Sequence, residues 1–121
     1  MKFSYVVLYV NDPATCLHFW TEQVGMIEKN RTQAGQFDIV KVGFAEQDFA
    51  FELVPLELMK DNPDGLDLAT PSIAFHVDDL EATRSELIGK GVQATDISEH
   101  SGVLSFGFAD NEDRWFAVTQ R

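Results

Sequence analysis

The sequence predicts an α+β fold made of two βαβββ modules, because its two halves repeat one pattern. Residues 5–12 read YVVLYVND and residues 72–79 read SIAFHVDD, and both are short apolar strands that end in Val and two polar residues. Each strand runs directly into a segment with helical periodicity, and the second copy follows the first after about 67 residues. A pattern that recurs at a fixed spacing indicates an internal duplication, which predicts the fold before any single side chain does.

The first module, about residues 1–55, is predicted to have one helix among four strands. Asn11 or Asp12 is expected to cap the helix, with Pro13 in its first turn. Gly25 ends the helix. Apolar residues with helical spacing mark its buried face: Leu17, Trp20 and Val24. The strands are predicted at residues 3–10, 26–32, 37–44 and 49–54.

The second module, about residues 72–121, repeats this order after a linker over residues 56–71. The linker is rich in Pro, Asp and Asn and is expected to hold one short helical turn at residues 56–60. Asp78 or Asp79 is expected to cap the second helix. Its apolar stripe is Leu80, Thr83, Leu87 and Ile88. The strands are predicted at residues 72–77, 92–98, 103–108 and 115–120, with an acidic turn at 110–113.

Size and charge restrict the class of protein. A chain of 121 residues is expected to form one compact domain with a real core. The net charge of −11 argues against nucleic acid as a partner, because phosphate binding needs a basic face. The acidic surface either attracts a cationic small molecule or only maintains solubility. No apolar run is long enough to span a membrane, no signal-peptide pattern opens the chain, and the lone Cys16 suits the cytoplasm.

Several motifs together carry a resemblance that covers essentially the whole chain. They are residues 5–13, Phe19-Trp20, Val24-Gly25, Phe51-Glu52-Leu53, residues 73–80 and Phe108-Ala109-Asp110. In these segments the chain resembles the vicinal oxygen chelate superfamily, which includes glyoxalase I, extradiol dioxygenases, fosfomycin-modifying enzymes and bleomycin-resistance proteins. The resemblance implies paired βαβββ modules whose mixed sheet curls around a cleft. It leaves the chemistry open, because one fold of this kind supports many functions.

The metal-binding members of that superfamily hold a divalent ion with up to four side chains, a His, a Glu, a second His and a second Glu. The matching positions in this chain are Tyr5, Glu52, Ser72 and Ala117. Glu52 alone retains a family ligand, whereas a divalent site needs three or more converging N, O or S ligands. We therefore predict that the protein binds no metal and uses no cofactor.

Strand alternation divides the predicted strands between a cleft face and a core face. The candidate ligand-binding residues on the cleft face are Tyr5, Tyr9, Glu52, Ser72, His76 and Trp115. The small or apolar residues Val7, Ala50, Ala74 and Ala117 and the polar Thr119 share that face. The core face is predicted to carry Val6, Leu8, Phe51, Leu53, Ile73, Phe75, Phe116 and Val118. Apolar walls with few polar anchors are typical of a small-molecule pocket.

Each candidate also has a purely structural interpretation. Glu52 is either a ligand anchor or a relic of the family metal site, and His76 is either an acid–base group or a satisfied, half-buried histidine. Tyr5 and Tyr9 either contact a ligand or fill a curved sheet. Trp115, next to the acidic turn, either stacks on a ligand or packs against the protein.

The leading hypothesis is a metal-free binding protein that resembles the bleomycin-resistance branch. Such a protein would be a homodimer that sequesters a drug or metabolite, and so confers antibiotic resistance, in clefts at the subunit interface. The expected ligand is flat, apolar or aromatic, and positively charged. The alternative is a glyoxalase-like lyase, isomerase or transferase in which Glu52 and His76 form a catalytic acid–base pair. A structural or regulatory dimer without a small ligand is the third possibility.

Overall fold

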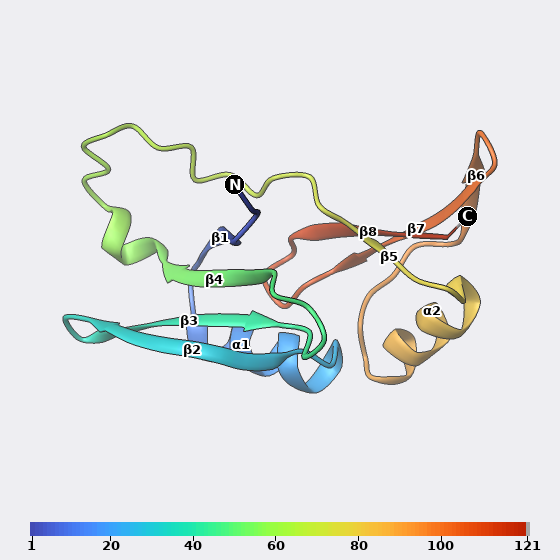
Figure 1. Cartoon of the computed structure of the whole chain (residues 1–121), viewed down its shortest axis with the longest axis horizontal. Coiled ribbons are helices and arrows are strands. Elements are labelled where there is room, and N and C mark those ends of the chain that lie inside the picture. Colours follow the sequence, from blue (N-terminus) through green and yellow to red (C-terminus); the bar gives the residue numbers. More distant parts are fainter. Residues whose placement is uncertain (121) are drawn as a thin grey trace. The chain divides into compact units, whose positions relative to one another are not determined.

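The computed structural model describes residues 1–120, which form two compact units with one four-stranded sheet each (Figure 1). The first unit is Met1–Thr70, and the second starts at Pro71, the last residue of the predicted linker. Each unit has the order strand, helix and three strands, so the predicted α+β class with two βαβββ modules is confirmed. Arg121, which ends the predicted second module, lies outside the described residues. Among the described helices, none is long and apolar enough to cross a membrane.

The sheet of the first unit has the strand order β1-β4-β3-β2, with β1 parallel to β4 and the other pairs antiparallel. Its elements are β1 (Tyr5–Val10), α1 (Pro13–His18), the π-helix η1 (Phe19–Gln23), β2 (Ile27–Ala34), β3 (Phe37–Gly43), β4 (Ala50–Pro55) and the 3₁₀-helix η2 (Leu56–Met59). All four predicted strands are present. The single predicted helix is instead a short α-helix that continues as a π-helix, with the amide of Val24 bonded to the carbonyl of Phe19 at 3.3 Å.

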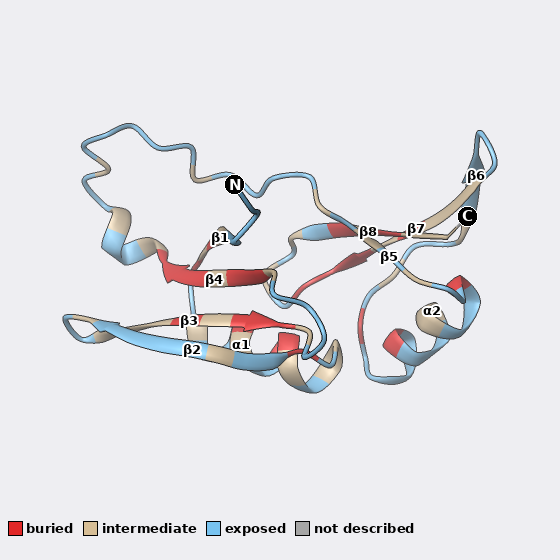
Figure 2. Cartoon of the chain, viewed as in Figure 1, coloured by how far each residue is buried: buried red, intermediate tan, exposed pale blue. Residues whose placement is uncertain are grey.

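The core of the first unit lies between its helices and one face of its sheet (Figure 2). The π-helix carries two neighbouring aromatic residues, Phe19 and Trp20, and both are buried. The Trp20 ring meets Phe19 and Phe51 edge-on, with centroids 5.2 and 5.1 Å away. Leu8 and Leu53 are buried on the sheet face predicted to form the core.

The sheet of the second unit repeats this topology in the order β5-β8-β7-β6, with β5 parallel to β8. Its elements are β5 (Ala74–His76), α2 (Leu80–Gly89), β6 (Ser98–His100), β7 (Val103–Ala109) and β8 (Trp115–Gln120). The predicted strand at 92–98 is only partly present. Ala94 forms an isolated bridge to Phe108, but the pairing with β7 is interrupted after Thr95, and β6 starts only at Ser98. Thr95 accepts the Gly107 amide at 2.8 Å through its side-chain Oγ1, and its carbonyl accepts Nε of Arg84 at 2.7 Å.

The second core contains the buried rings of Phe108 and Phe116, with the partly buried ring of Phe75 beside them. The centroids of Phe108 and Phe116 are 5.6 Å apart in a stacked arrangement, and Phe75 lies 6.0 Å from Phe108. Leu80 and Leu87 of α2 are buried on the same side of the unit. Phe116 therefore lies in the core, as alternation along β8 predicts, whereas Phe75 is only partly buried at its edge.

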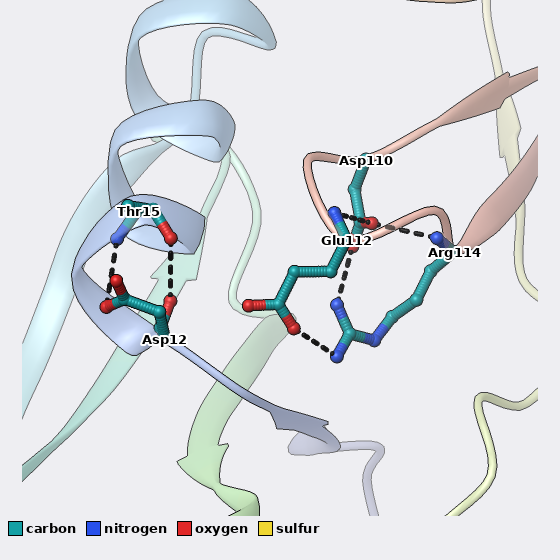
Figure 3. Close-up of polar contacts among 5 residues, drawn as sticks. All are labelled: Asp12, Thr15, Asp110, Glu112 and Arg114. Atoms are coloured by element: carbon teal, nitrogen blue, oxygen red, sulfur yellow. Dashed lines mark hydrogen bonds and ion pairs between the residues drawn. The ribbon is translucent and has the colours of Figure 1, made fainter.

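The duplication is also visible in the backbone at the start of each helix. Asp12 caps α1 with φ −131° and ψ 98°, and Asp79 caps α2 with φ −129° and ψ 97°. The Asp12 carboxylate accepts the amides of Ala14 and Thr15, and the Thr15 hydroxyl donates to the Asp12 carbonyl at 3.1 Å (Figure 3). The structure thus selects Asp12 and Asp79 over the neighbouring Asn11 and Asp78, which were equally acceptable caps from sequence.

Candidate functional site

The face of the first sheet that carries Glu52 is more exposed to solvent than the opposite face, which packs against the core. In β4 every residue is buried except Glu52, which is half-buried with its side chain 20% exposed. Tyr5 at the start of β1 is exposed, Tyr9 near its end is intermediate, and Ala50, predicted to line the cleft, is buried. A carboxylate in an otherwise buried strand indicates a local polar environment on this face.

Lys41 of β3 provides that environment. Lys41 is the register partner of Glu52, and its Nζ lies 3.8 Å from Oε2 of Glu52. The same Nζ lies 4.1 Å from the centroid of the Tyr5 ring, within the range of a cation–π contact. We call this group the Tyr5–Lys41–Glu52 cluster. Glu52 is therefore not the free anionic anchor expected from the sequence, and the basis for a cationic ligand is weaker.

Lys41 is not among the site residues predicted from the sequence, although strand alternation places it on the same face as the candidate residues. Val40 and Val42 on either side are buried, so Lys41 must face away from the core. The register that places it opposite Glu52 depends on pairing between β3 and β4, which the sequence pattern does not determine.

The second unit has an open groove of about 350 Å³ on its sheet. It is lined by Ser72, Ile73, Ser105, Phe106, Gly107, Trp115, Phe116 and Ala117. Of the predicted ligand-binding residues, Ser72 and Trp115 therefore lie together at this groove. The Trp115 residue is 47% exposed, so its ring is available to a molecule in the groove. This volume falls in the range of natural ligand pockets.

The groove exists because small residues meet in the ladder beside Trp115. Gly107 pairs with Ala117, and a Cβ added at Gly107 would lie 3.5 Å from Cε3 of Trp115. The matching antiparallel position in the first unit holds the long side chains of Lys41 and Glu52. The two modules thus use one ladder position in opposite ways, as a charged pair and as a hollow.

His76 lies in β5 opposite Thr119 and is exposed, and it does not line the groove. Glu52 belongs to the first unit and His76 to the second. The acid–base pair of the enzyme hypothesis therefore stays a prediction. Because the Glu52 carboxylate already faces the Lys41 ammonium, no contact among residues 1–120 favours it as a free general base.

The residues at the family metal-ligand positions do not fit a divalent ion. Within residues 1–120 no group of three or more His, Cys, Asp or Glu side chains is placed to hold a metal. The Lys41 ammonium 3.8 Å from Glu52 adds a positive charge at the position where a metal would need electron donors. Tyr5, the neighbouring family position, contributes its ring to Lys41.

A buried ion-pair network fixes the turn that precedes Trp115 (Figure 3). Oδ1 of Asp110 accepts the amides of Glu112 and Arg114, each at 2.9 Å, and Oδ2 lies 3.2 Å from Nη1 of Arg114. Nη2 of Arg114 donates to Glu112 at 2.8 Å. Burial alone would lower the pKa of Arg114, but the bond to Glu112 and the charge of Asp110 outweigh it, so that pKa is raised. The network holds the start of β8 in place.

Solved structures of similar fold include both binding proteins and enzymes. A member of the glyoxalase/bleomycin resistance protein/dioxygenase superfamily from Sphaerobacter thermophilus DSM 20745 has a TM-score of 0.85 at 16% identity, covering 100% of this chain and 98% of the other. TnmS3, an antibiotic binding protein from Streptomyces sp. CB03234, has a TM-score of 0.81 at 16% identity, covering 99% and 95%. Lactoylglutathione lyase from Agrobacterium tumefaciens has a TM-score of 0.75 at 15% identity, covering 98% and 92%.

At these identities the structural likeness establishes the fold alone. No curated protein matches the sequence. Residues 2–116 match the family model described as Glyoxalase/Bleomycin resistance protein/Dioxygenase superfamily, and the chain therefore belongs to that superfamily.

Proposed function

We propose that this protein binds a small, flat, largely apolar organic molecule in the groove of the second unit. The observation that carries the proposal is the groove of about 350 Å³ beside the exposed Trp115 ring. Besides the Trp115 ring, the groove is lined by the small residues Gly107 and Ala117 and by the hydroxyls of Ser72 and Ser105, whereas Phe106 and Phe116 are buried. Apolar walls with sparse polar anchors bind ring systems and fix their orientation.

In this proposal Trp115 stacks on the ligand, and Gly107 and Ala117 leave the space that the ligand fills. The Asp110–Arg114 turn holds Trp115 in place before binding, which reduces the entropy lost when the complex forms. The description of TnmS3 as an antibiotic binding protein supports a drug or natural product as the ligand. Sequestration of such a molecule, without metal or cofactor, is the function that we propose.

Fluorescence of the two tryptophans provides the test. Trp20 is fully buried in the first unit, so a Trp20→Phe variant leaves Trp115 as the reporter of the groove. We expect 2-ethylnaphthalene, a flat apolar probe, to quench this signal saturably and to shift the amide resonances of Gly107 and Ala117. Trp115→Ala should weaken binding of the probe by about 5- to 50-fold, the loss expected for one aromatic contact.

Ile27→Ala is the matched control, because Ile27 is also 47% exposed but lies on β2 of the first unit. It should leave the affinity unchanged. Equal weakening by both substitutions would mean that the probe only adheres to exposed apolar surface. Binding of no flat apolar probe at millimolar concentration would overturn the proposal.

We further propose that the protein acts as a homodimer in the cytoplasm. Exposed apolar residues outside the groove and the Tyr5–Lys41–Glu52 cluster, among them Phe3 and Ile88, support the first point, because soluble monomers rarely leave large apolar patches uncovered. The lone Cys16 supports the second. Sedimentation velocity at micromolar concentrations should give a dimer, and a monomer throughout that range would contradict the assembly.

A further inference from the structure

We propose that the first unit carries a polar binding position of its own, in which Lys41 donates to an oxygen acceptor of a small aromatic molecule. The acceptor is a carbonyl, carboxylate or phenolate oxygen, and the aromatic part lies beside Tyr5. This inference goes beyond the proposed function, because it concerns the first unit alone and needs no ligand in the groove.

The Lys41 ammonium is held in place but keeps its hydrogen-bonding capacity. Within residues 1–120 its contacts are the Tyr5 ring at 4.1 Å and Oε2 of Glu52 at 3.8 Å. The second distance exceeds the ~2.7–2.9 Å of a charged hydrogen bond. An ammonium group has three N–H donors and no acceptor. Tyr5 and Glu52 therefore orient the ammonium group of Lys41, and neither accepts a short hydrogen bond from it.

The cluster is accessible from solvent without being freely mobile. The Lys41 side chain is 28% exposed, and that of Glu52 is 20% exposed. The other lysine–glutamate pairs of the described residues are more exposed. Lys60 and Glu57 are 74% and 55% exposed at 3.6 Å, as expected for an ordinary surface pair. A partly desolvated, oriented ammonium has less entropy to lose to a ligand than a mobile surface lysine has.

The charge arrangement favours an acceptor over a cation. A cation that approached Glu52 would also meet the ammonium of Lys41, which already offsets the carboxylate. An oxygen acceptor instead meets open N–H donors, and the aromatic ring of the ligand lies beside the exposed Tyr5 side chain. The net charge of −11 still opposes anions at long range, so a neutral carbonyl should also bind.

Three probes with the same rings isolate the acceptor: 2-naphthoate, 2-acetylnaphthalene and 2-ethylnaphthalene. The full chain is produced with ¹³Cε-labelled lysine, which leaves the ammonium groups unmodified, and the Lys41 Hε–Cε resonance is followed during titration with each probe. We expect saturable shifts with the first two probes and a response at least about 5-fold weaker with the third. The Lys60 resonance is the matched control and should not move.

Substitutions then test the direction of the effect. Lys41→Met should weaken 2-naphthoate binding at the β3 and β4 amides by about 10-fold, whereas Lys41→Arg should retain most of it. Glu52→Gln removes the competing carboxylate and should tighten binding of 2-naphthoate. Lys60→Met should leave binding unchanged. Opposite signs for the Lys41 and Glu52 variants are the signature that a purely structural ion pair would not give.

Several results would overturn the inference. One is an unmoved Lys41 resonance with both acceptor probes. A second is equal affinity of Lys41→Met and the unmodified chain for 2-naphthoate, and a third is a stronger response to 2-naphthylmethylammonium. The Trp115 fluorescence signal reports the groove separately. Quenching of Trp115 without a Lys41 response would therefore reject this inference and leave the proposed function intact. A Lys41 response without quenching of Trp115 would support this inference and reject the proposed function.

Discussion

The turn between β7 and β8 provides a sharp test of what stabilises the second unit, through the single substitution Asp110→Asn. The Asp110 side chain is fully buried, and its two oxygens accept two backbone amides and one guanidinium N–H. Asparagine has the same size but only one acceptor oxygen. If that oxygen keeps both backbone amides, the new NH₂ group faces Nη1 of Arg114, donor against donor.

The size of the effect follows from these contacts. Loss of one partner from a buried ion pair costs roughly 3–5 kcal/mol. Arg114 keeps Glu112 at 2.8 Å, and the substituted side chain would keep both backbone bonds, so we expect a loss near the low end, about 3 kcal/mol. For a chain of this size that corresponds to a fall in Tm of about 10 °C.

Urea unfolding monitored by Trp115 fluorescence in a Trp20→Phe background measures this loss in the second unit. Asp113→Asn is the matched control, because it makes the same charge change at an exposed residue of the same turn. Asp113 has φ 62°, a conformation that asparagine tolerates well. The control should stay within about 0.5 kcal/mol. A loss below about 1 kcal/mol for Asp110→Asn, or equal losses for both variants, would refute the assignment of Asp110 as a buried structural anchor.

Three further outcomes are expected. Gly107→Ala should weaken binding of 2-ethylnaphthalene several-fold, because the added methyl group occupies the groove. It should not lower Tm, because the methyl group meets its neighbours at ordinary contact distances of 3.5 Å or more. Unchanged affinity would contradict the position of the ligand. Asp12→Ala and Asp79→Ala should each lower the free energy of unfolding by about 1 kcal/mol in urea titrations, and no loss at either residue would reject its role as a cap. The hydrogen bond from Arg31 lowers the pKa of Glu28 in the folded protein. The stabilisation that Glu28 contributes is therefore present above its pKa in the unfolded chain, and it is lost as the pH falls through its pKa in the folded protein. Arg31→Gln should return that pKa toward its ordinary value in an NMR titration, and an unchanged pKa would show that the pair is absent in solution.

The sequence predicted best what depends on neighbouring residues. The caps at Asp12 and Asp79 need only a carboxylate two or three residues before free amides, and apolar alternation needs only the local strand. The same local signals predicted seven of the eight strands in approximately the right places. The eighth, at residues 92–98, is reduced to a bridge at Ala94, because the Gly107 amide donates to the Thr95 hydroxyl where a continuous strand would offer the Thr95 carbonyl.

The candidate site was harder to predict because it depends on distant residues. Alternation alone would have turned Lys41 away from the core, but its position opposite Glu52 is a matter of β3–β4 register. Register follows from the packing of whole strands and is not encoded in either one. Similarly, the groove beside Trp115 requires Gly107 and Ala117, which lie on different strands, to be opposed. The π-helix at Phe19–Gln23 was missed because helical periodicity does not distinguish a wider turn over five residues.

The matched ladder positions of the two modules have a consequence for how this chain can change. Lys41 and Glu52 in one copy, and Gly107 and Ala117 in the other, are opposed on the same hydrogen-bonded frame. After a duplication, substitution of both residues at such a position exchanges a charged pair for a small pair on the same backbone frame. Redesign could follow the same route. Replacing Lys41 and Glu52 by Gly and Ala would place a small pair in the first module, and replacing Gly107 and Ala117 by Lys and Glu would fill the groove of the second module.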